Sequence, residues 1–220
     1  MDNHWKWPQI EAACRYIGEH FGDQLRQSSY PPHFYEFGVY KGTSLCLMHD
    51  WALKVGLGKP IIWGIDSFEG LPPEPFGVAP SPMFKPGDYS MAKENMLSTD
   101  ACAAIVQGAA NYHGCTATII RDRFAELKKW DNMREAALVH LDCDQYGSTR
   151  DALFFLFKNQ LIRKHTLLAY DEFTTGGAGP QMAHNEALHF FGAQAAEIFH
   201  YCYRDKKTNV MVRQAVWEIC

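Results

Sequence analysis

The sequence lacks the features that mark membrane, secreted and zinc-ribbon proteins. No apolar run is long enough to cross a bilayer, and the first residues do not resemble a signal peptide. The seven cysteines are odd in number and form no Cys-x-x-Cys pair, so neither a disulfide framework nor cysteine-based zinc binding is expected. These absences predict a reduced, cytoplasmic protein with no membrane partner.

An excess of basic residues is also missing. Lys and Arg number 21 against 25 Asp and Glu, which gives a formal net charge of −4. Because nucleic-acid binding depends on clustered positive charge, no nucleic-acid partner is expected. The 220 residues contain no internal repeat or low-complexity linker, so one domain over residues 1–220 is predicted, with 1–30 as an N-terminal helical extension.

The first segment has apolar residues at helical spacing. This pattern predicts an amphipathic helix that ends before the break at residues 28–32. Its apolar face can pack on a partner subunit, so a homo-oligomer is left open. The residues that carry the pattern are Ile10, Ala13, Cys14, Ile17 and Phe21.

Strand and helix patterns alternate through the rest of the chain. A short apolar run from Phe34 to Val39, a helical pattern and a second run from Ile61 to Asp66 form a β-α-β unit. The last two strands have only a short turn between them and should form an antiparallel hairpin. The expected fold class is therefore α/β, a doubly wound, mostly parallel seven-stranded sheet with an antiparallel C-terminal hairpin. The remaining strands are expected at 116–120, 137–141, 167–170, 198–203 and 210–216.

A proline-rich segment interrupts this alternation. Residues 67–88 hold six of the eleven prolines and little periodicity. Loops of this length in compact domains are usually functional or disordered, and the aromatic residues Phe68, Phe76 and Phe84 argue against simple disorder. The segment is expected to form a wall or lid over a binding site.

The end of the first strand carries features of a cofactor site, because ligands of open α/β sheets bind beyond the carboxyl ends of the strands. Gly38 permits a tight turn, and the acid Glu36 would suit the ammonium group of a methionine moiety. A dinucleotide fingerprint would place glycine at Tyr40, so a pyrophosphate ligand is disfavoured. Thr43 or Ser44 is expected to cap the next helix and to offer donors to a ligand.

The second strand ends in an acid that fits a nucleoside. Asp66, followed by Ser67 and Phe68, can accept both hydroxyls of a ribose. Asp88 to Ser90, or Asp122 to Phe124 after the third strand, are weaker candidates for adenine contact. Together the strand ends fit S-adenosylmethionine, and they fit NAD apart from the missing glycine.

Carboxylates follow the fourth and fifth strands. Asp142, Asp171 and Glu172 should converge, and like charges so close require protonation or a cation. An all-oxygen set predicts Mg²⁺, Mn²⁺ or Ca²⁺ rather than zinc. Asp144 is more simply explained as a helix cap. His184 is the candidate for a general base.

Three of these segments resemble motifs of the macrocin O-methyltransferase family, in the same order along the chain. They are Glu36 to Ser44, Ile65 to Pro72, and Leu141 to Leu153, and the resemblance extends from about Phe34 to Phe191. The C-terminal segment matches poorly.

The resemblance implies a Rossmann-like class I methyltransferase that uses S-adenosylmethionine and Mg²⁺ to methylate a hydroxyl of a small molecule, notably a sugar of a natural product. It implies that Asp142, also catalytic, binds the metal with Asp171 and Glu172; the family commonly has Asp at the last position. An NAD-dependent oxidoreductase and a non-catalytic S-adenosyl-ligand-binding domain remain alternatives, and the acceptor stays open.

Overall fold

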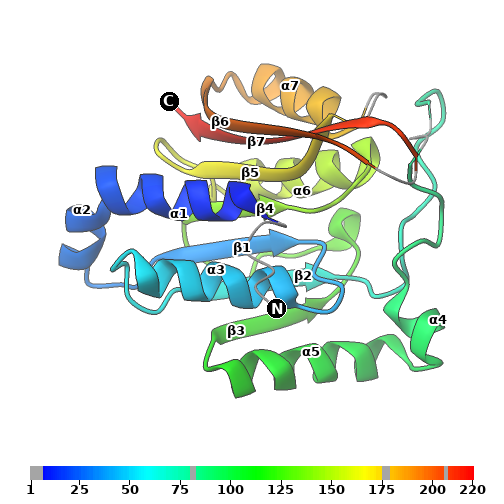
Figure 1. The fold of residues 1–220 in the computed structure, drawn as a ribbon, viewed down its shortest axis with the longest axis horizontal. Coiled ribbons are helices and arrows are strands. Elements are labelled where there is room, and N and C mark those ends of the chain that lie inside the picture. Colours follow the sequence, from blue (N-terminus) through cyan, green and yellow to red (C-terminus); the bar gives the residue numbers. More distant parts are fainter. Residues whose placement is uncertain (1–6, 80–82, 175–178, 206–207) are drawn as a thin grey trace.

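The computed structural model describes residues 7–79, 83–174, 179–205 and 208–220. Parts of the proline-rich segment (80–82) and of the predicted hairpin turn (206–207) therefore lie outside the described residues. The chain forms a seven-stranded sheet flanked by helices on both faces (Figure 1). Its strands are β1 (His33–Phe37), β2 (Ile61–Asp66), β3 (Thr116–Arg121), β4 (Ala136–Leu141), β5 (Leu167–Thr174), β6 (Ala195–Arg204) and β7 (Met211–Ile219).

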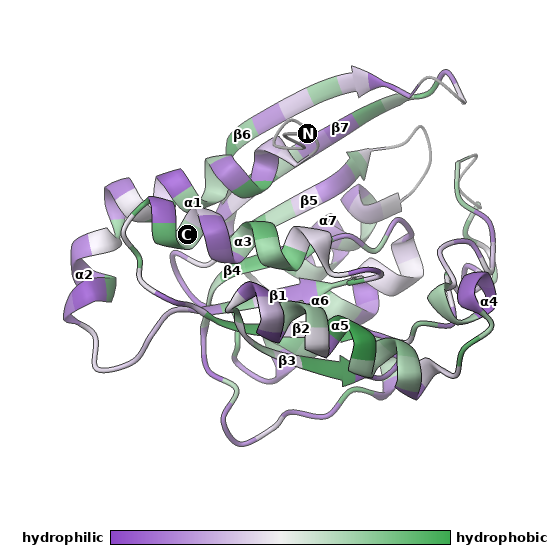
Figure 2. Cartoon of the chain, turned by 60° about the horizontal axis from the view of Figure 1, so that its bottom comes forward, coloured by the Kyte–Doolittle hydropathy of each residue, from purple (hydrophilic) through white to green (hydrophobic). Residues whose placement is uncertain are grey.

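The strand order is β3-β2-β1-β4-β5-β7-β6. The strands from β3 to β5 are parallel, and β7 lies antiparallel between β5 and β6. The predicted sheet and its antiparallel C-terminal hairpin are thus confirmed. The order reverses between β1 and β4, which is where such sheets open a crevice for ligands. The outer hairpin mixes hydrophilic and hydrophobic residues along its length, as expected for strands with a solvent-exposed face (Figure 2).

The helices bury two apolar cores, one on each face of the sheet. α1, α3 and α5 cover one face, and α6 and α7 cover the other (Figure 1). The helices are α1 (Pro8–His20), α2 (Gly22–Gln27), α3 (Thr43–Lys54), α4 (Met91–Asn95), α5 (Thr99–His113), α6 (Tyr146–Lys158) and α7 (Gly179–Phe191), with a 3-10 turn, η1 (Phe124–Glu126).

The first helix packs on its own sheet. α1 contacts α3 and strands β4 to β7, and its face with Ile10, Ala13 and Ile17 is buried there. The apolar face proposed for a partner subunit is therefore covered within the chain, because burial against the central strands removes the same area from water.

The start of α3 differs from the expected cap. Gly42, in a left-handed conformation, precedes the helix, and no side chain caps it. Thr43 is exposed and Ser44 is buried in the first turn, so the prediction that either one caps the helix is wrong. The left-handed turn favours glycine and places the hydroxyls inside the helix instead.

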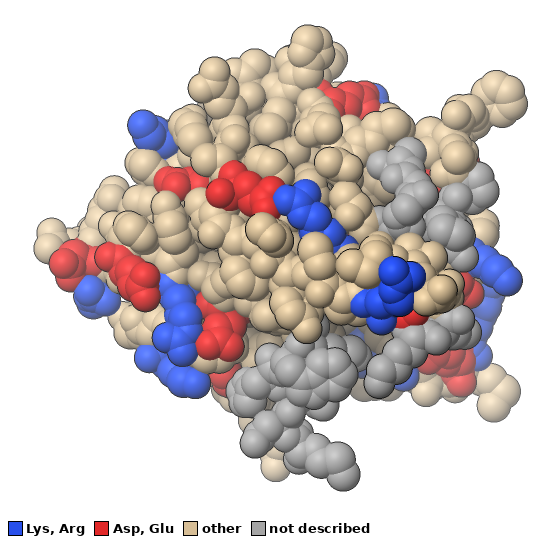
Figure 3. All heavy atoms as spheres, turned by 45° about the horizontal axis from the view of Figure 1, so that its top comes forward, with Lys and Arg blue, Asp and Glu red and all other residues tan. Residues whose placement is uncertain are grey.

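Charges on the surface are mixed. On the face in Figure 3, acidic and basic side chains lie in small groups of both signs. Within the described ranges, no helix combines the length and the apolar character needed to cross a membrane.

Candidate functional site

A cavity of about 800 Å³ lies beyond the carboxyl ends of the parallel strands. Its lining comes from the ends of β1, β2, β3, β4 and β5 and from the proline-rich segment. The segment runs along the edge toward which the parallel strand arrows point (Figure 1). A cavity of this size suits a ligand of several hundred daltons.

The backbones of β1 and β4 approach each other closely at the floor of the cavity. Gly38 follows β1 with a φ of 89°, and a Cβ atom there would lie 2.0 Å from the carbonyl oxygen of Asp142. Only glycine fits this position, both because of its left-handed φ and because of the contact. The turn therefore brings the ends of β1 and β4 together without a side chain between them.

Asp66 organises the turns around it. Its Oδ2 accepts hydrogen bonds from the backbone N–H groups of Val39 and Tyr40, both at 2.8 Å, and its Oδ1 accepts one from Phe68 at 2.6 Å. Tyr40 and Phe68 have φ values of 49° and 60°, uncommon for residues other than glycine. Asp66 thus stabilises two left-handed turns, and burial raises its pKa despite these bonds. A carboxylate has about four acceptor positions, so a ligand hydroxyl can still bond to it.

Three carboxylates meet at the ends of β4 and β5. Asp142, Asp171 and Glu172 each offer an oxygen, and these oxygens lie within 4.8 Å of one another. All three residues line the cavity. Oxygen donors at this spacing are those preferred by Mg²⁺, Mn²⁺ and Ca²⁺.

The electrostatics of this carboxylate cluster favour a bound cation. Burial and the neighbouring Asp171 raise the pKa of Glu172 well above its usual value. Asp144, which shares a hydrogen bond with Glu172, has its pKa raised by burial to about 7. These carboxyl groups resist full ionisation by themselves, and a divalent cation would relieve that repulsion. The residues present therefore fit a hard divalent metal.

A buried polar chain stands behind the cluster. Asp171 Oδ1 accepts hydrogen bonds from the side-chain amides of Gln9 (2.8 Å) and Gln214 (2.6 Å). The Gln9 amide nitrogen is also 3.4 Å from His140 Nε2, and His140 Nδ1 lies 3.0 Å from Glu36 Oε1. Glu36 is fully buried and is turned toward His140 rather than into the cavity. The structure therefore does not place Glu36 where it could meet a ligand ammonium group directly.

The proline-rich segment forms a wall of the cavity and is fixed to α6. The Glu74 carboxylate accepts hydrogen bonds from the backbone N–H groups of Tyr146 and Gly147, both at 2.9 Å. These are free donors of the first helical turn. A Cβ atom on Gly147 would lie 2.9 Å from Pro75, so glycine allows the segment to pack directly on the helix. Asp144, expected to cap this helix, lines the cavity instead.

Several predicted ligand residues line the cavity. Gly38, Tyr40, Asp66, Ser67 and Asp122 do so. Thr43, Ser44 and Phe68 do not: Phe68 is fully buried in the core under α1, α3 and α5, and only its backbone N–H reaches Asp66.

His184 is remote from the cavity lining. It lies on α7 in the opposite core, where Tyr170, Phe173 and Trp217 surround its ring. Its Nδ1 is 2.8 Å from the Tyr170 hydroxyl, and burial lowers its pKa to about 4. The structure gives no support to His184 as the general base, because its ring is packed among aromatic side chains outside the cavity lining.

Other residues of the site were not foreseen. No local sequence pattern marks Gln9 and Gln214, because each side chain acts through a hydrogen bond to Asp171, which is distant from it in the sequence. Trp7 and Tyr203 also line the cavity, as does Tyr89, which lies within the weaker candidate range 88–90 for adenine contact.

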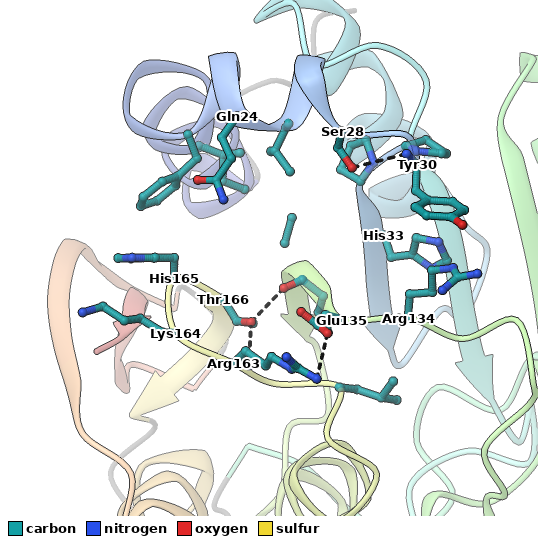
Figure 4. Close-up of a pocket in the computed structure, with 18 of the residues that line it drawn as sticks. Gln24, Ser28, Tyr30, His33, Arg134, Glu135, Arg163, Lys164, His165 and Thr166 are labelled. Carbon is teal, nitrogen blue, oxygen red and sulfur yellow. Dashed lines mark hydrogen bonds and ion pairs between the residues drawn. The ribbon is translucent and has the colours of Figure 1, made fainter.

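A second cavity, of about 510 Å³, lies at the opposite end of the same strands (Figure 4). Its charged lining residues are exposed and include one acid, Glu135. Arg163 bonds to Glu135 at 2.9 Å, and the Arg134 guanidinium lies 4.3 Å from the centre of the Tyr30 ring. His33 is buried there, and Thr166 donates its hydroxyl to the Ala136 carbonyl at 2.7 Å. Ligands of parallel sheets bind at the other edge, so this cavity is not the expected catalytic site.

The chain matches a family of known enzymes along most of its length. The family model of macrocin O-methyltransferases matches residues 19–175. The solved structure of the O-methyltransferase NovP is similar with a TM-score of 0.61 and 17% identity, over 96% of this chain and 79% of that one. CalS11, a calicheamicin methyltransferase, gives a TM-score of 0.53 and 18% identity, over 95% and 76% of the two chains. At these identities the structural likeness shows the fold, and no curated sequence matches the chain.

Proposed function

We propose that this chain, which belongs to the macrocin O-methyltransferase family, methylates a hydroxyl of a natural-product intermediate held beside a divalent metal ion. That it is an S-adenosylmethionine-dependent O-methyltransferase follows from the family. The metal, the acceptor class and the roles of individual residues are the proposal. The observation that carries it is the shared cavity, in which a nucleoside-type turn and a carboxylate cluster lie together.

The cofactor side of the cavity is formed by the ends of β1, β2 and β3. Gly38 leaves room for the methionine part, Asp66 would accept ribose hydroxyls, and Asp122 lies where adenine contact is expected. Tyr40 and Ser67 complete this side. We assign the direct cofactor contacts to these residues rather than to Glu36, whose carboxylate is directed to His140.

The acceptor side is formed by the carboxylate cluster and the proline-rich wall. Asp142, Asp171 and Glu172 would hold Mg²⁺ or Mn²⁺, and a bound ion would stabilise the negative charge that develops on the acceptor oxygen. Asp142 connects the two sides, because its backbone carbonyl packs against Gly38. The wall residues Leu71 and Pro72 would orient the acceptor and exclude water. The family is named after macrocin, and CalS11 is described as a calicheamicin methyltransferase. Both names support a natural-product acceptor.

Calorimetric titration with S-adenosylhomocysteine, with and without Mg²⁺ and with NAD as control, tests the cofactor assignment. Binding of S-adenosylhomocysteine without binding of NAD is expected. Release of S-adenosylhomocysteine from S-adenosylmethionine, measured with a panel of glycosylated and phenolic hydroxyl compounds, then tests the acceptor class. Turnover that persists in full after chelation would contradict a role of the metal in methyl transfer. Turnover with amine acceptors alone would contradict a hydroxyl as the methyl acceptor.

A further inference from the structure

A second group of metal-ligating side chains lies outside the cavity, on the helices of the α1, α3 and α5 face. Cys46, His49 and Asp50 occupy α3 at positions i, i+3 and i+4, which places them on neighbouring parts of one helix surface. His113 is the last residue of α5, and Cys115 precedes β3. None of the five lines the cavity. The group therefore does not belong to the methyl-transfer site.

Two histidines converge on one aspartate oxygen. His113 Nε2 lies 2.8 Å from Asp50 Oδ1, and His49 Nδ1 lies 3.2 Å from the same oxygen. The two imidazole rings are 5.9 Å apart between centroids and inclined at 73°. The three ligand atoms lie within 4.8 Å of one another. One ion with bonds of about 2.0–2.1 Å can reach all three after small side-chain shifts.

The exposure of the three residues suits capture of an ion from solution. The His49 side chain is only 4% exposed, so packing of α3 holds it in place. Asp50 and His113 are 49% and 41% exposed, so an ion can reach them from solvent and retain water on its open side. Because His49 is already held in place, less side-chain entropy is lost when an ion binds.

We propose that His49, Asp50 and His113 form a binding site for Zn²⁺. Two imidazoles and one carboxylate are borderline ligands, which suit zinc, whereas Mg²⁺ prefers oxygen-only sets such as the carboxylate cluster. The chain then has two cation sites of different ligand chemistry. Zinc at this site would link α3 to the end of α5 and stabilise the layer that covers β1 to β3.

A neighbouring thiol pair is the competing holder of zinc. A hydrogen bond from Cys115 lowers the pKa of Cys46 to about 7, and nearby His113 acts in the same direction. A thiolate there could bind zinc together with Cys115. The histidine–aspartate site and the dithiol site make opposite predictions for variants of Cys46 and His113, so they can be distinguished.

The test is calorimetric titration of the full chain with Zn²⁺ in a large excess of Mg²⁺, which occupies the carboxylate cluster. Wild-type protein should bind one Zn²⁺, and His113→Ala and Asp50→Asn should each weaken binding at least about tenfold. Cys46→Ser and the exposed His189→Ala are the matched controls and should bind as wild type. Because Asp50, His113 and His189 are exposed, these substitutions should leave the fold intact.

Three results would overturn the proposal. They are absence of Zn²⁺ binding by the wild-type protein in excess Mg²⁺, unchanged binding by both His113→Ala and Asp50→Asn, and binding that is lost in Cys46→Ser but kept in His113→Ala. Zinc-dependent thermal stabilisation gives a second readout that does not depend on methyl transfer. The midpoint should rise with Zn²⁺ in wild type and in Cys46→Ser but not in His113→Ala.

Discussion

The two cavities of this chain are bounded by the same strands, β1, β4 and β5, at opposite ends. At the amino ends, four exposed basic residues and the exposed acid Glu135 line the cavity, with Arg163 paired to Glu135 and Arg134 stacked on Tyr30. At the carboxyl ends, four carboxylates meet, and burial raises the pKa of Glu172 and Asp144. Concavity is thus common to both ends, whereas the charged side chains at the amino ends are exposed to water and the four carboxylates at the carboxyl ends are buried or half-buried. Buried carboxyl groups with shifted pKa values, more than concavity itself, therefore mark the carboxyl-end cavity as the functional-site candidate.

The largest effect expected from this contrast is on catalysis. Asp142→Asn keeps the size of the side chain but removes one negative charge from the carboxylate cluster proposed to hold the metal. If the metal supplies several kcal/mol of transition-state stabilisation, methyl transfer should fall about 1,000-fold or more. The measurement is the rate of S-adenosylhomocysteine release at saturating Mg²⁺ and acceptor.

Glu135→Gln is the matched control at the other cavity. It removes an acid that is paired with an exposed Arg163, and it should leave the methyl-transfer rate near wild type. Equal losses of rate in both variants, with both folded, would mean that the contrast between the cavities is not functional. Retained binding of S-adenosylhomocysteine by Asp142→Asn would show that the variant loses rate in the methyl-transfer step and not in cofactor binding.

A smaller effect should come from the residues that orient the proposed metal ligands. Gln214→Ala removes one of two amides that bond to Asp171 Oδ1. Loss of such an outer hydrogen bond typically weakens metal affinity roughly 10- to 100-fold. The Mg²⁺ concentration that gives half-maximal activity should rise accordingly, whereas Gln24→Ala at the amino-end cavity should leave it unchanged. An unchanged Mg²⁺ requirement in Gln214→Ala would remove Asp171 from the proposed ligand set.

The contrast also explains which parts of the molecule the sequence could predict. Strand ends follow from local patterns, so β2 was located at Ile61–Asp66 without error, and Gly38 and Asp66 were found at the cavity. The three carboxylates were expected to converge because parallel strands share one edge, and they do lie together.

Side-chain direction could not be predicted in the same way. Glu36 ends a strand as expected but points into a buried chain that needs His140 and Gln9, residues from distant segments. His184 faces the core because Tyr170 and Trp217 surround it, which no local pattern reveals. Each of these outcomes depends on contacts across more than 10 residues of sequence, where short-range rules carry no information.

The wall of the carboxyl-end cavity should respond to loss of its anchor. Glu74→Ala removes two hydrogen bonds to the first turn of α6. Capping interactions of this kind contribute about 1 kcal/mol, so the thermal midpoint should fall by about 2–4 °C. The KM of the acceptor should rise more than that of S-adenosylmethionine, because the wall lies on the acceptor side. Glu126→Ala, another acid on the cavity lining, is the control, and an equal midpoint shift in both variants would contradict the anchoring role.

The smallest effect concerns His33 in the amino-end cavity. Burial, with a contribution from the positive charge of Arg134, lowers its pKa from the usual 6.5 to about 4. Its Nδ1 accepts a hydrogen bond from Trp63 Nε1 at 3.1 Å, so protonation there would break that bond. The unfolded chain binds the proton below pH 6.5 whereas the folded chain does not until about pH 4, so stability should fall as pH drops through this window.

His33→Gln can still accept the hydrogen bond from Trp63 but cannot titrate. Between pH 7 and pH 6 the wild-type protein should lose more unfolding free energy than the variant, by less than about 1 kcal/mol because solvent in the cavity screens part of the effect. Urea unfolding at the two pH values measures the difference, with the exposed His189→Gln as control. If wild type and His33→Gln lose the same unfolding free energy between the two pH values, His33 does not contribute to the pH dependence of stability. The protonation of His33, the buried ionisable group of the amino-end cavity, would then be uncoupled from folding. The two cavities would differ more strongly, because burial raises the pKa of carboxyl groups at the carboxyl-end site.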